Sequence, residues 1–239
     1  MTFANLDDPN ITFAFSARIL KNMSLSYGDT RDSLSNRMNF LAGLGIDYRD
    51  LVCAKQVHAS SVRYATQEDK GRGALTYDDA IPDTDGFVTD KRNLPLAIFT
   101  ADCLSIFLYD PHAPAIGMIH AGWRSSAANI AVEAVSLMQG KFNTGASGLC
   151  AWFGPAIRSC CYEVGSDFNK FFPSGLMERN NRYYLDLARI NKNQLLGAGL
   201  NEENIFDSGI CTSCNNNKFF SFRKEGEACG RMMSVIMLK

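Results

Sequence analysis

The sequence predicts a mixed α/β fold, with one mixed β-sheet and helices packed on its faces. Short apolar runs of strand length alternate irregularly with segments of helical period, which is typical of this fold class. Hydrophobic residues make up 46% of the 239 residues, enough for a sizeable buried core. No internal repeat, low-complexity tract or proline- and serine-rich linker divides the chain. We therefore expect residues 1–239 to form a single domain.

The predicted strands are apolar runs bounded by turn-forming residues. In chain order they lie at residues 11–19, 51–57, 61–66, 96–99, 104–109, 115–119, 149–153, 205–210 and Met232–Leu238. Residues 71–73 and 78–85 are polar and rich in glycine and aspartate, which predicts a turn-rich loop. Within that loop, Asp83 and Asp85 are expected to shape a turn.

Helices are predicted at residues 31–44, 125–138 and 186–196. The apolar stripe expected on the first helix consists of Leu34, Met38, Leu41 and Ala42. The face expected on the second consists of Ala127, Ile130, Ala131, Ala134, Val135 and Met138. Asp186 is a suitable N-cap for the third, because its carboxylate can accept from free amides of the first turn.

Charge and composition exclude several classes of partner. The formal net charge is −1, so no global field attracts nucleic acid or an anionic membrane, and an anionic substrate must be held by local arginines. The sequence contains no run of about 18 apolar residues, so a membrane-spanning helix is not expected. Residues 1–8 lack the basic start and apolar core of a secretory leader, so a cytoplasmic location and reduced cysteines are expected. Cys53 and Cys150 lie in apolar runs and should pack as small hydrophobes.

Two of the three histidines, together with one cysteine, lie at the ends of predicted strands. His58, Cys103 and His120 would supply two imidazoles and one thiolate with an open fourth position, which suits a catalytic zinc ion. Their wide separation in sequence excludes a zinc finger. Simple hydrogen bonding of each histidine is the alternative. His112 lies in a proline-bounded turn and is expected to be exposed.

The segments around these residues carry a family resemblance. The chain resembles the YfiH-like laccase-domain family, the purine nucleoside phosphorylase group, in four ordered motifs: Gln56-Val57-His58, Thr100-Ala101-Asp102-Cys103, His120-Ala121-Gly122-Trp123-Arg124 and the 154–165 segment. Shorter matches at 15–18, 36–37, 83–86 and 220–223 stand in the same order, so that the resemblance extends from about Phe13 to Leu238. The chain departs from the family pattern at Ala59, Ser105, Ser125 and Arg158–Ser159, which bears on loop shape and substrate preference and leaves the three ligands intact.

The resemblance implies an α/β protein that holds one zinc ion through His58, Cys103 and His120. It implies phosphorolysis of adenosine, inosine and guanosine to the base and ribose 1-phosphate. Phosphorolysis of methylthioadenosine and deamination of adenosine are also attributed to the family, and an older label names it a copper polyphenol oxidase. The chain lacks the H-x-E motif of known zinc deaminases, so a deaminase activity would use a different arrangement.

Phosphorolysis requires a phosphate site and stabilisation of the departing purine. Arginine suits phosphate because its planar fork donates two parallel hydrogen bonds. Arg37, Arg124 and Arg18 are the candidates, in that order, with ordinary structural or solvated roles as alternatives. Asp102, next to Cys103, could act catalytically by moving a proton or could orient a ligand histidine. Trp123 is expected to contribute packing more than base stacking, and Glu163 to be structural.

Other functions remain open from sequence alone. Cys103 and His120 could form the nucleophile and base of a cysteine hydrolase that needs no metal. A multicopper oxidase requires more than three histidines, although a single copper site of two histidines and one cysteine is conceivable. A metal-binding protein without catalytic activity is a further alternative. The preferred nucleoside and the oligomeric state are left open.

Cys211 and Cys214 have the spacing of a zinc knuckle or a redox pair. The chain has no second C-x-x-C motif, so a structural zinc ion would have to recruit Cys160 and Cys161, or Cys229. Cys160 and Cys161, which are adjacent in sequence, are expected instead to be structural residues around the pocket.

Overall fold

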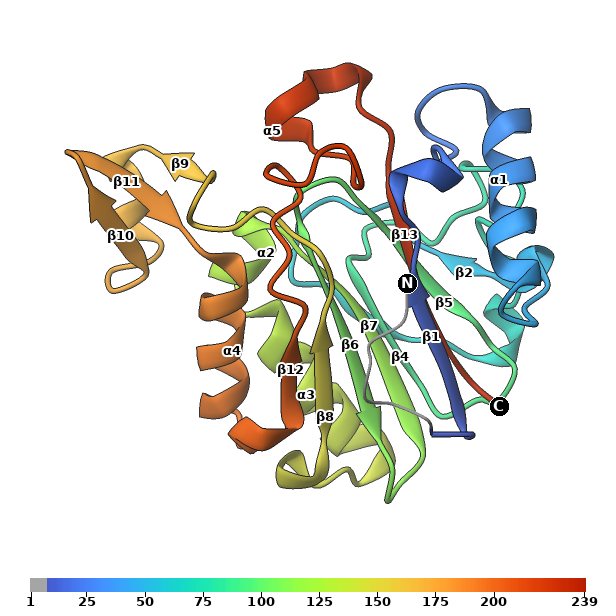
Figure 1. Ribbon diagram of the computed structural model, residues 1–239. Helices are drawn as coiled ribbons and strands as arrows, with labels where there is room; N and C mark the ends of the chain where they lie inside the picture. Colours follow the sequence, from blue (N-terminus) through green and yellow to red (C-terminus); the bar gives the residue numbers. More distant parts are fainter. Residues whose placement is uncertain (1–7) are drawn as a thin grey trace.

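The computed structural model describes residues 8–239 and shows a mixed α/β arrangement (Figure 1). The predicted fold class is confirmed, but the strands form three sheets where one was expected. Residues 1–7, on which the expected lack of a leader largely depends, lie outside the described residues. Among residues 8–239, no helix is long and apolar enough to cross a membrane.

Two larger sheets form the centre of the molecule. The four-stranded sheet has the order β1 (Ile11–Phe15), β13 (Met232–Leu238), β5 (Leu96–Thr100) and β2 (Val52–Cys53). The six-stranded sheet has the order β12 (Ile205–Asp207), β8 (Cys150–Phe153), β6 (Leu104–Asp110), β7 (Ala115–Ala121), β4 (Gly86–Thr89) and β3 (Val62–Tyr64). Strand β1 pairs antiparallel with β13, so both ends of the described chain lie in one sheet.

Apolar side chains from both sheets form a common core. The ring of Phe13, on β1, lies 5.2 Å from the rings of both Phe107 and Trp152, which belong to the six-stranded sheet. Helix α1 (Thr30–Ala42) packs on the outer face of the four-stranded sheet. Helices α2 (Trp123–Ala127), α3 (Ile130–Phe142) and α4 (Leu187–Gly197) lie on the other side, against the six-stranded sheet (Figure 1).

The third sheet projects to one side of the molecule (Figure 1). It consists of β10 (Leu176–Arg179), β11 (Arg182–Leu185) and β9 (Glu163–Val164). The sequence did not predict these strands, because they are largely exposed and lack an apolar run. Strand β4 was also missed, since its four residues directly follow a long polar loop. Helix α5 (Phe222–Glu225) precedes the last strand.

Several predicted boundaries were wrong. The helix expected at 125–138 is two helices, because Asn129 adopts the left-handed region with a φ of 59° and separates α2 from α3. The expected apolar face of α3 is confirmed from Ile130 to Met138. The strand expected at 51–57 stops after two residues, which leaves the segment before His58 as a loop. Asp186 is confirmed as the N-cap of α4.

The apolar stripe expected on α1 was only partly right, because Leu41 is fully buried but Met38 and Ala42 are exposed. Met38 is 47% exposed, whereas Arg37, the residue before it, is only 1% exposed and packs inward beside Phe40 and Leu41. The guanidinium of Arg37 donates to three backbone carbonyl oxygens, those of Met23, Gly73 and Ala74. A charged side chain can be buried when hydrogen bonds satisfy it, and this allows the helix to turn its other face to the core.

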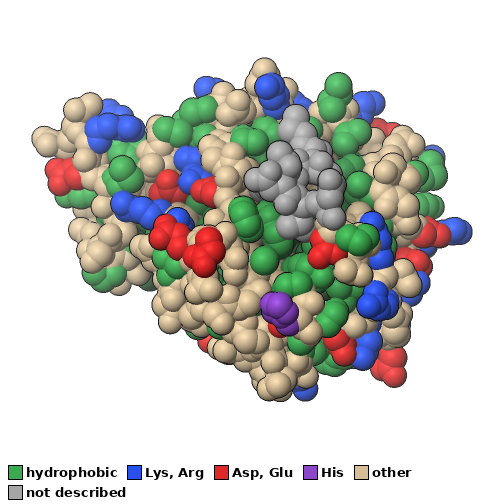
Figure 2. Space-filling model, turned by 60° about the horizontal axis from the view of Figure 1, so that its bottom comes forward, with side chains coloured by type: hydrophobic (Ala, Val, Ile, Leu, Met, Phe, Trp, Pro, Cys, Tyr) green, Lys and Arg blue, Asp and Glu red, His purple; other side chains and the backbone are tan. Residues whose placement is uncertain are grey.

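The end of the molecule opposite α5 is shown in Figure 2. Lysine and arginine side chains are intermixed there with aspartate and glutamate, and apolar atoms lie between them. This face therefore shows no concentrated charge of one sign. The loops that carry the predicted metal ligands lie at the other end, where β7 leads into α2 and β5 leads into β6.

Candidate metal centre and substrate cavity

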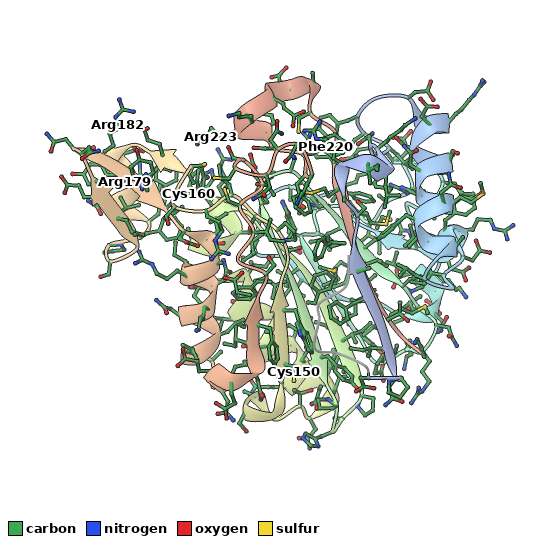
Figure 3. All side chains as sticks on the ribbon, viewed as in Figure 1. Cys150, Cys160, Arg179, Arg182, Phe220 and Arg223 are labelled. Atoms are coloured by element: carbon green, nitrogen blue, oxygen red, sulfur yellow. The ribbon has the colours of Figure 1, made fainter. Side chains whose placement is uncertain are left out.

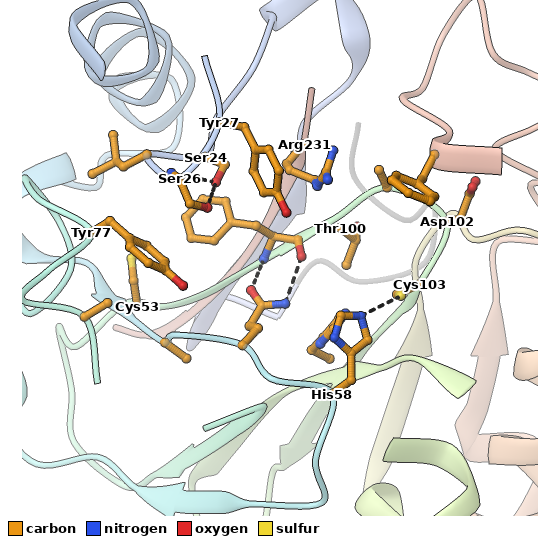
Figure 4. A pocket seen from close by; sticks show the side chains of 18 of the residues that line it. Ser24, Ser26, Tyr27, Cys53, His58, Tyr77, Thr100, Asp102, Cys103 and Arg231 are labelled. Atoms are coloured by element: carbon orange, nitrogen blue, oxygen red, sulfur yellow. Dashed lines mark hydrogen bonds between the residues drawn. The ribbon is translucent and has the colours of Figure 1, made fainter. Parts of the chain in front are cut away.

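Three separate segments bring His58, Cys103 and His120 together. The potential ligand atoms of these side chains all lie within 4.8 Å of one another. The Nε2 atom of His58 is 3.8 Å from the Sγ atom of Cys103 (Figure 4). The imidazole rings of His58 and His120 have centroids 4.7 Å apart. These three residues could hold a metal ion.

His120 is fixed by a buried carboxylate that sequence reasoning assigned to a turn. It lies near the end of β7, and its Nδ1 atom is 2.7 Å from Oδ1 of Asp85. Asp85 is 0% exposed. Because this contact occupies Nδ1, the Nε2 atom of His120 is left for a ligand, an arrangement that metal-binding histidines commonly show. Burial by itself lowers the pKa of His120, but the charges of Cys103 and Asp85 and its hydrogen bonds raise it to about 9.

The same carboxylate positions His58. Asp85 accepts hydrogen bonds from the backbone N–H groups of Val57, His58 and Ala59, at 2.8 to 3.1 Å. His58 has a backbone φ of 61°, which residues other than glycine rarely adopt. The three hydrogen bonds to Asp85 therefore stabilise an unfavourable backbone conformation. The side-chain amide of Gln56 both donates to and accepts from the backbone of Phe99 on β5.

Gly122 allows the ligand side chains to approach one another. A Cβ atom at this position would lie 2.8 Å from Cδ2 of His58 and 3.2 Å from Sγ of Cys103. Its φ of −78° is open to any residue, so the requirement for glycine is steric.

We expect Gly122→Ala to displace the imidazole of His58 and weaken metal binding about tenfold or more, the usual effect of disturbing a ligand's support. Metal affinity can be measured by competition with a chromogenic chelator. The control is Gly140→Ala, because a Cβ atom there would meet no atom within 4 Å. Equal affinities of Gly122→Ala and wild type would contradict the steric role.

Cys103 follows a backbone conformation that is unusual for aspartate. Asp102 has a φ of 88° and is held by hydrogen bonds from the Thr212 hydroxyl (2.6 Å) and the Arg223 N–H (2.7 Å) to its two carboxylate oxygens. The carboxylate that contacts a ligand histidine is thus Asp85, and Asp102 connects the 211–223 segment to Cys103. Burial by itself raises the pKa of Cys103, but the charge and hydrogen bonds of His120 and His58 lower it to about 6.

The lowered pKa gives a testable reactivity. In metal-free protein, the Cys103 thiolate should form as the pH rises through about 6, whereas an ordinary thiol needs a pH near 8.5. The rate of alkylation by iodoacetamide, followed by peptide mass spectrometry, should therefore reach half its maximum near pH 6. His120→Ala should move that midpoint upward, because it removes the neighbouring positive charge. A wild-type midpoint above pH 8 would contradict this prediction.

A cavity of about 550 Å³ opens beside the three residues. This volume lies within the range of small-molecule pockets. Figure 4 shows His58, Cys103 and Asp102 on one side of it and hydroxyl-bearing side chains on the other. The latter are Ser24, Ser26, Tyr27 and Tyr77.

The three arginines predicted to bind phosphate have different positions relative to the cavity. Arg124 is exposed and lines the cavity, with its guanidinium 4.5 Å from the Trp123 ring. Arg37 lines the cavity wall but donates to three carbonyl groups, as described above. Arg18 is not among the lining residues, and its guanidinium pairs with the Glu225 carboxylate.

Two further arginines, Arg223 and Arg231, line the cavity, and neither was predicted as a site residue. Arg223 donates to the carbonyl of Glu163, and Arg231 lies over the Tyr27 ring at 3.9 Å. The 220–223 motif match was the available signal for Arg223. Tyr162 also lines the cavity; burial, and then the negative charge of Cys103, raises the pKa of its hydroxyl, which therefore stays protonated.

Trp123 contributes to packing, as expected. Its ring lies 4.9 Å from the ring of Phe168 and 5.2 Å from that of Phe171. Its side chain also lines the cavity. His112 is exposed and remote from the other two histidines, as its proline-bounded turn predicted.

Comparisons with known proteins identify the family. A family model described as multi-copper polyphenol oxidoreductase laccase matches residues 16–239. The chain belongs to this laccase family. Among its relatives, purine nucleoside phosphorylase YlmD of Geobacillus stearothermophilus is 37% identical over 225 residues, covering 90% of this chain and 82% of that protein. Adenosine deaminase RL5, from an unknown prokaryotic organism, is 32% identical and covers 86% and 82% of the two chains.

A solved member of the laccase family has the same fold. The crystal structure of YfiH from Bacillus licheniformis superimposes with a TM-score of 0.92 at 31% identity, and the match covers 98% of each chain. The resemblance to the YfiH-like family is thereby confirmed.

Proposed function

We propose that the protein is a zinc-dependent purine nucleoside phosphorylase that converts adenosine, inosine and guanosine to the base and ribose 1-phosphate. The observation that carries this proposal is the convergence of His58, Cys103 and His120 on a cavity that arginines also line. Relatives named purine nucleoside phosphorylase support it.

The residues present fit zinc. Zinc accepts imidazole nitrogen and thiolate sulfur and, in catalytic sites, three protein ligands with one open position. The lowered pKa of Cys103 favours the thiolate that such a site needs, and Asp85 holds His120 in one orientation. Although the family description names several coppers, the chain has three histidines, and only His58 and His120 belong to the cluster. A bound zinc ion would supply a Lewis acid beside the substrate.

Phosphorolysis breaks the bond between ribose C1′ and the purine nitrogen, with positive charge growing on the sugar and negative charge on the base. In the proposal, Arg124 and Arg223 bind phosphate from the cavity wall, because guanidinium groups match phosphate oxygens in both charge and geometry. Arg37, whose guanidinium donates to three carbonyl groups, and Arg18, which pairs with Glu225 outside the cavity lining, stabilise the wall and the loops behind it.

The remaining lining residues suit a nucleoside. The hydroxyl of Tyr162 stays protonated, so it can donate a hydrogen bond to an oxygen or nitrogen on which negative charge develops. The hydroxyl-bearing group of Ser24, Ser26, Tyr27 and Tyr77 offers donors, acceptors and aromatic faces to the rest of the substrate.

The experiment that tests this function is a product profile. Inosine, adenosine and methylthioadenosine are incubated with the protein in the presence and absence of phosphate, and bases and sugar phosphates are separated by chromatography. We expect base release to require phosphate and to match the ribose 1-phosphate formed from inosine and adenosine. Equal base release without phosphate would reject phosphorolysis.

Adenosine deamination is a second candidate, favoured by the similarity to RL5. It would use the same cavity and would need a group that moves a proton beside the metal-capable residues. Formation of inosine from adenosine without phosphate is its signature. The same product profile therefore separates the two activities.

A further inference from the structure

A second group of thiols lies outside the site described above. Cys160 and Cys161 lie in the turn that follows β8, and Cys211 and Cys214 lie in the segment that follows β12. Their four Sγ atoms all lie within 4.8 Å of one another. Cys214 Sγ is 3.5 Å from Cys160 Sγ and 3.3 Å from Cys161 Sγ, and all four cysteines are free thiols.

We propose that Cys160, Cys161, Cys211 and Cys214 bind a structural zinc ion, distinct from the metal held by His58, Cys103 and His120. Zinc bound by four thiolates is tetrahedral with Zn–S distances of about 2.3 Å, which places the sulfurs about 3.8 Å apart. Two of the observed sulfur–sulfur separations, 3.3 and 3.5 Å, lie slightly below this value, and none of the others exceeds 4.8 Å. Four protein ligands leave no open position, so this ion would be structural and not catalytic.

The arrangement fits one ion better than two disulfides. Cys214 approaches both Cys160 and Cys161, so its sulfur is shared among neighbours and has no single partner. The separations of 3.3 and 3.5 Å exceed the disulfide bond length of about 2.05 Å. The two-residue spacing between Cys211 and Cys214 is common among zinc ligands, whereas Cys160 and Cys161 are brought to the same point only by the fold.

The ion would reinforce two segments that backbone hydrogen bonds already join in part. Residue Cys211 forms an isolated β-bridge with Ala156, and the N–H of Thr212 donates to the carbonyl of Ala156. Both segments contact Asp102: the N–H of Ile157 donates to its carbonyl, and the hydroxyl of Thr212 donates to its carboxylate. Asp102 immediately precedes Cys103, so the thiol cluster supports the wall of the cavity from behind.

The same segments carry cavity residues. Tyr162 follows Cys161 directly, and Arg223 lies nine positions after Cys214 and donates through its backbone N–H to Asp102. Figure 3 shows Cys160 and Arg223 toward the same end of the molecule, with Cys150 at the other end. A structural zinc ion would therefore hold two residues of the cavity wall in place without touching the substrate.

Metal stoichiometry tests the proposal without reference to activity. The full chain is purified with a reductant and zinc, and the zinc content is measured by inductively coupled plasma mass spectrometry. We expect two zinc ions per chain for wild type and for the control Cys150→Ser, and one for Cys214→Ser. His58→Ala should also retain one, and His58→Ala with Cys214→Ser none.

The outcomes separate the two sites. If Cys214→Ser keeps the wild-type zinc content, the proposal is wrong, whatever His58→Ala does. If Cys214→Ser loses zinc while His58→Ala keeps the wild-type zinc content, the four-cysteine site stands and the metal assignment in the proposed function fails.

Because Cys214→Ser could prevent folding, X-ray absorption of the zinc in His58→Ala provides a second measurement. We expect four sulfur scatterers at about 2.3 Å. Nitrogen scatterers in that spectrum, or disulfides among the four cysteines in the intact reduced protein, would overturn the proposal.

Discussion

Replacing His58 with alanine should remove the metal from the centre beside the cavity and lower kcat/KM for inosine phosphorolysis at least a hundredfold. Only three residues of the described chain converge there, so the loss of one leaves two ligands. An electrostatic catalytic group is commonly worth about 3–4 kcal/mol, which corresponds to about 10²- to 10³-fold in rate. Steady-state kinetics, together with zinc content, measure both effects.

The same variant separates the phosphorylase from a cysteine hydrolase. A hydrolase built on Cys103 and His120 keeps both residues in His58→Ala and should keep its activity without metal. His112→Ala is the matched control, because it removes the one histidine that lies outside the cluster. A His58→Ala protein with full zinc content and full rate would show that the site assignment is wrong.

Replacing Asp85 with alanine should have the second large effect, on stability as well as on the metal. Four hydrogen bonds converge on this fully buried carboxylate, from His120 and from the N–H groups of Val57, His58 and Ala59. Its removal leaves buried donors without an acceptor and an imidazole without its charged partner, so the free energy of unfolding should fall by about 3–5 kcal/mol.

Metal binding should weaken as well, because Asp85 orients His120 and fixes the loop that carries His58. Thermal unfolding and metal competition measure the two effects. Asp83→Asn is the control, since Asp83 is exposed and belongs to the same turn. If Asp85→Ala matched Asp83→Asn in both measurements, the carboxylate would have no positioning role.

The contribution of Asp85 to stability should depend on pH. Burial by itself raises the pKa of Asp85, but the hydrogen bond and charge of His120 and the amide hydrogen bonds lower it below its ordinary value. A carboxylate whose pKa is lower in the folded than in the unfolded state stabilises the fold above its ordinary pKa of about 4. This stabilisation should be lost as the pH falls below that value.

The three potential metal ligands were accessible from sequence because their chemistry is rare in this chain. Two of only three histidines stand in short motifs at the ends of predicted strands, and the motifs occur in the family's order. The exposure of His112 was also predictable, since a proline-bounded turn usually lies at the surface. Patterns of residue type therefore indicated which side chains could form a site.

The residues that fix those ligands were not accessible in the same way. Asp85 was predicted to shape a turn because it ends a polar loop, and the strand that follows it, β4, has only four residues. Arg37 was predicted as the first candidate for phosphate binding, since nothing local shows that the carbonyl groups of residues 23, 73 and 74 converge on its guanidinium. Arg223 and Arg231 enter the cavity from segments that the sequence places far from it.

The sequence by itself determined the fold class, most of the strands and helices, and the set of side chains able to hold a metal, because these depend on local periodicity and residue chemistry. Only the tertiary structure decided that His58, Cys103 and His120 meet, that Asp85 supports both histidines, and that four cysteines from two distant segments converge. The physical reason is that such contacts join residues tens of positions apart, and strand pairing and loop geometry bring them together. The local pattern of residue types therefore does not show which of these distant residues come into contact.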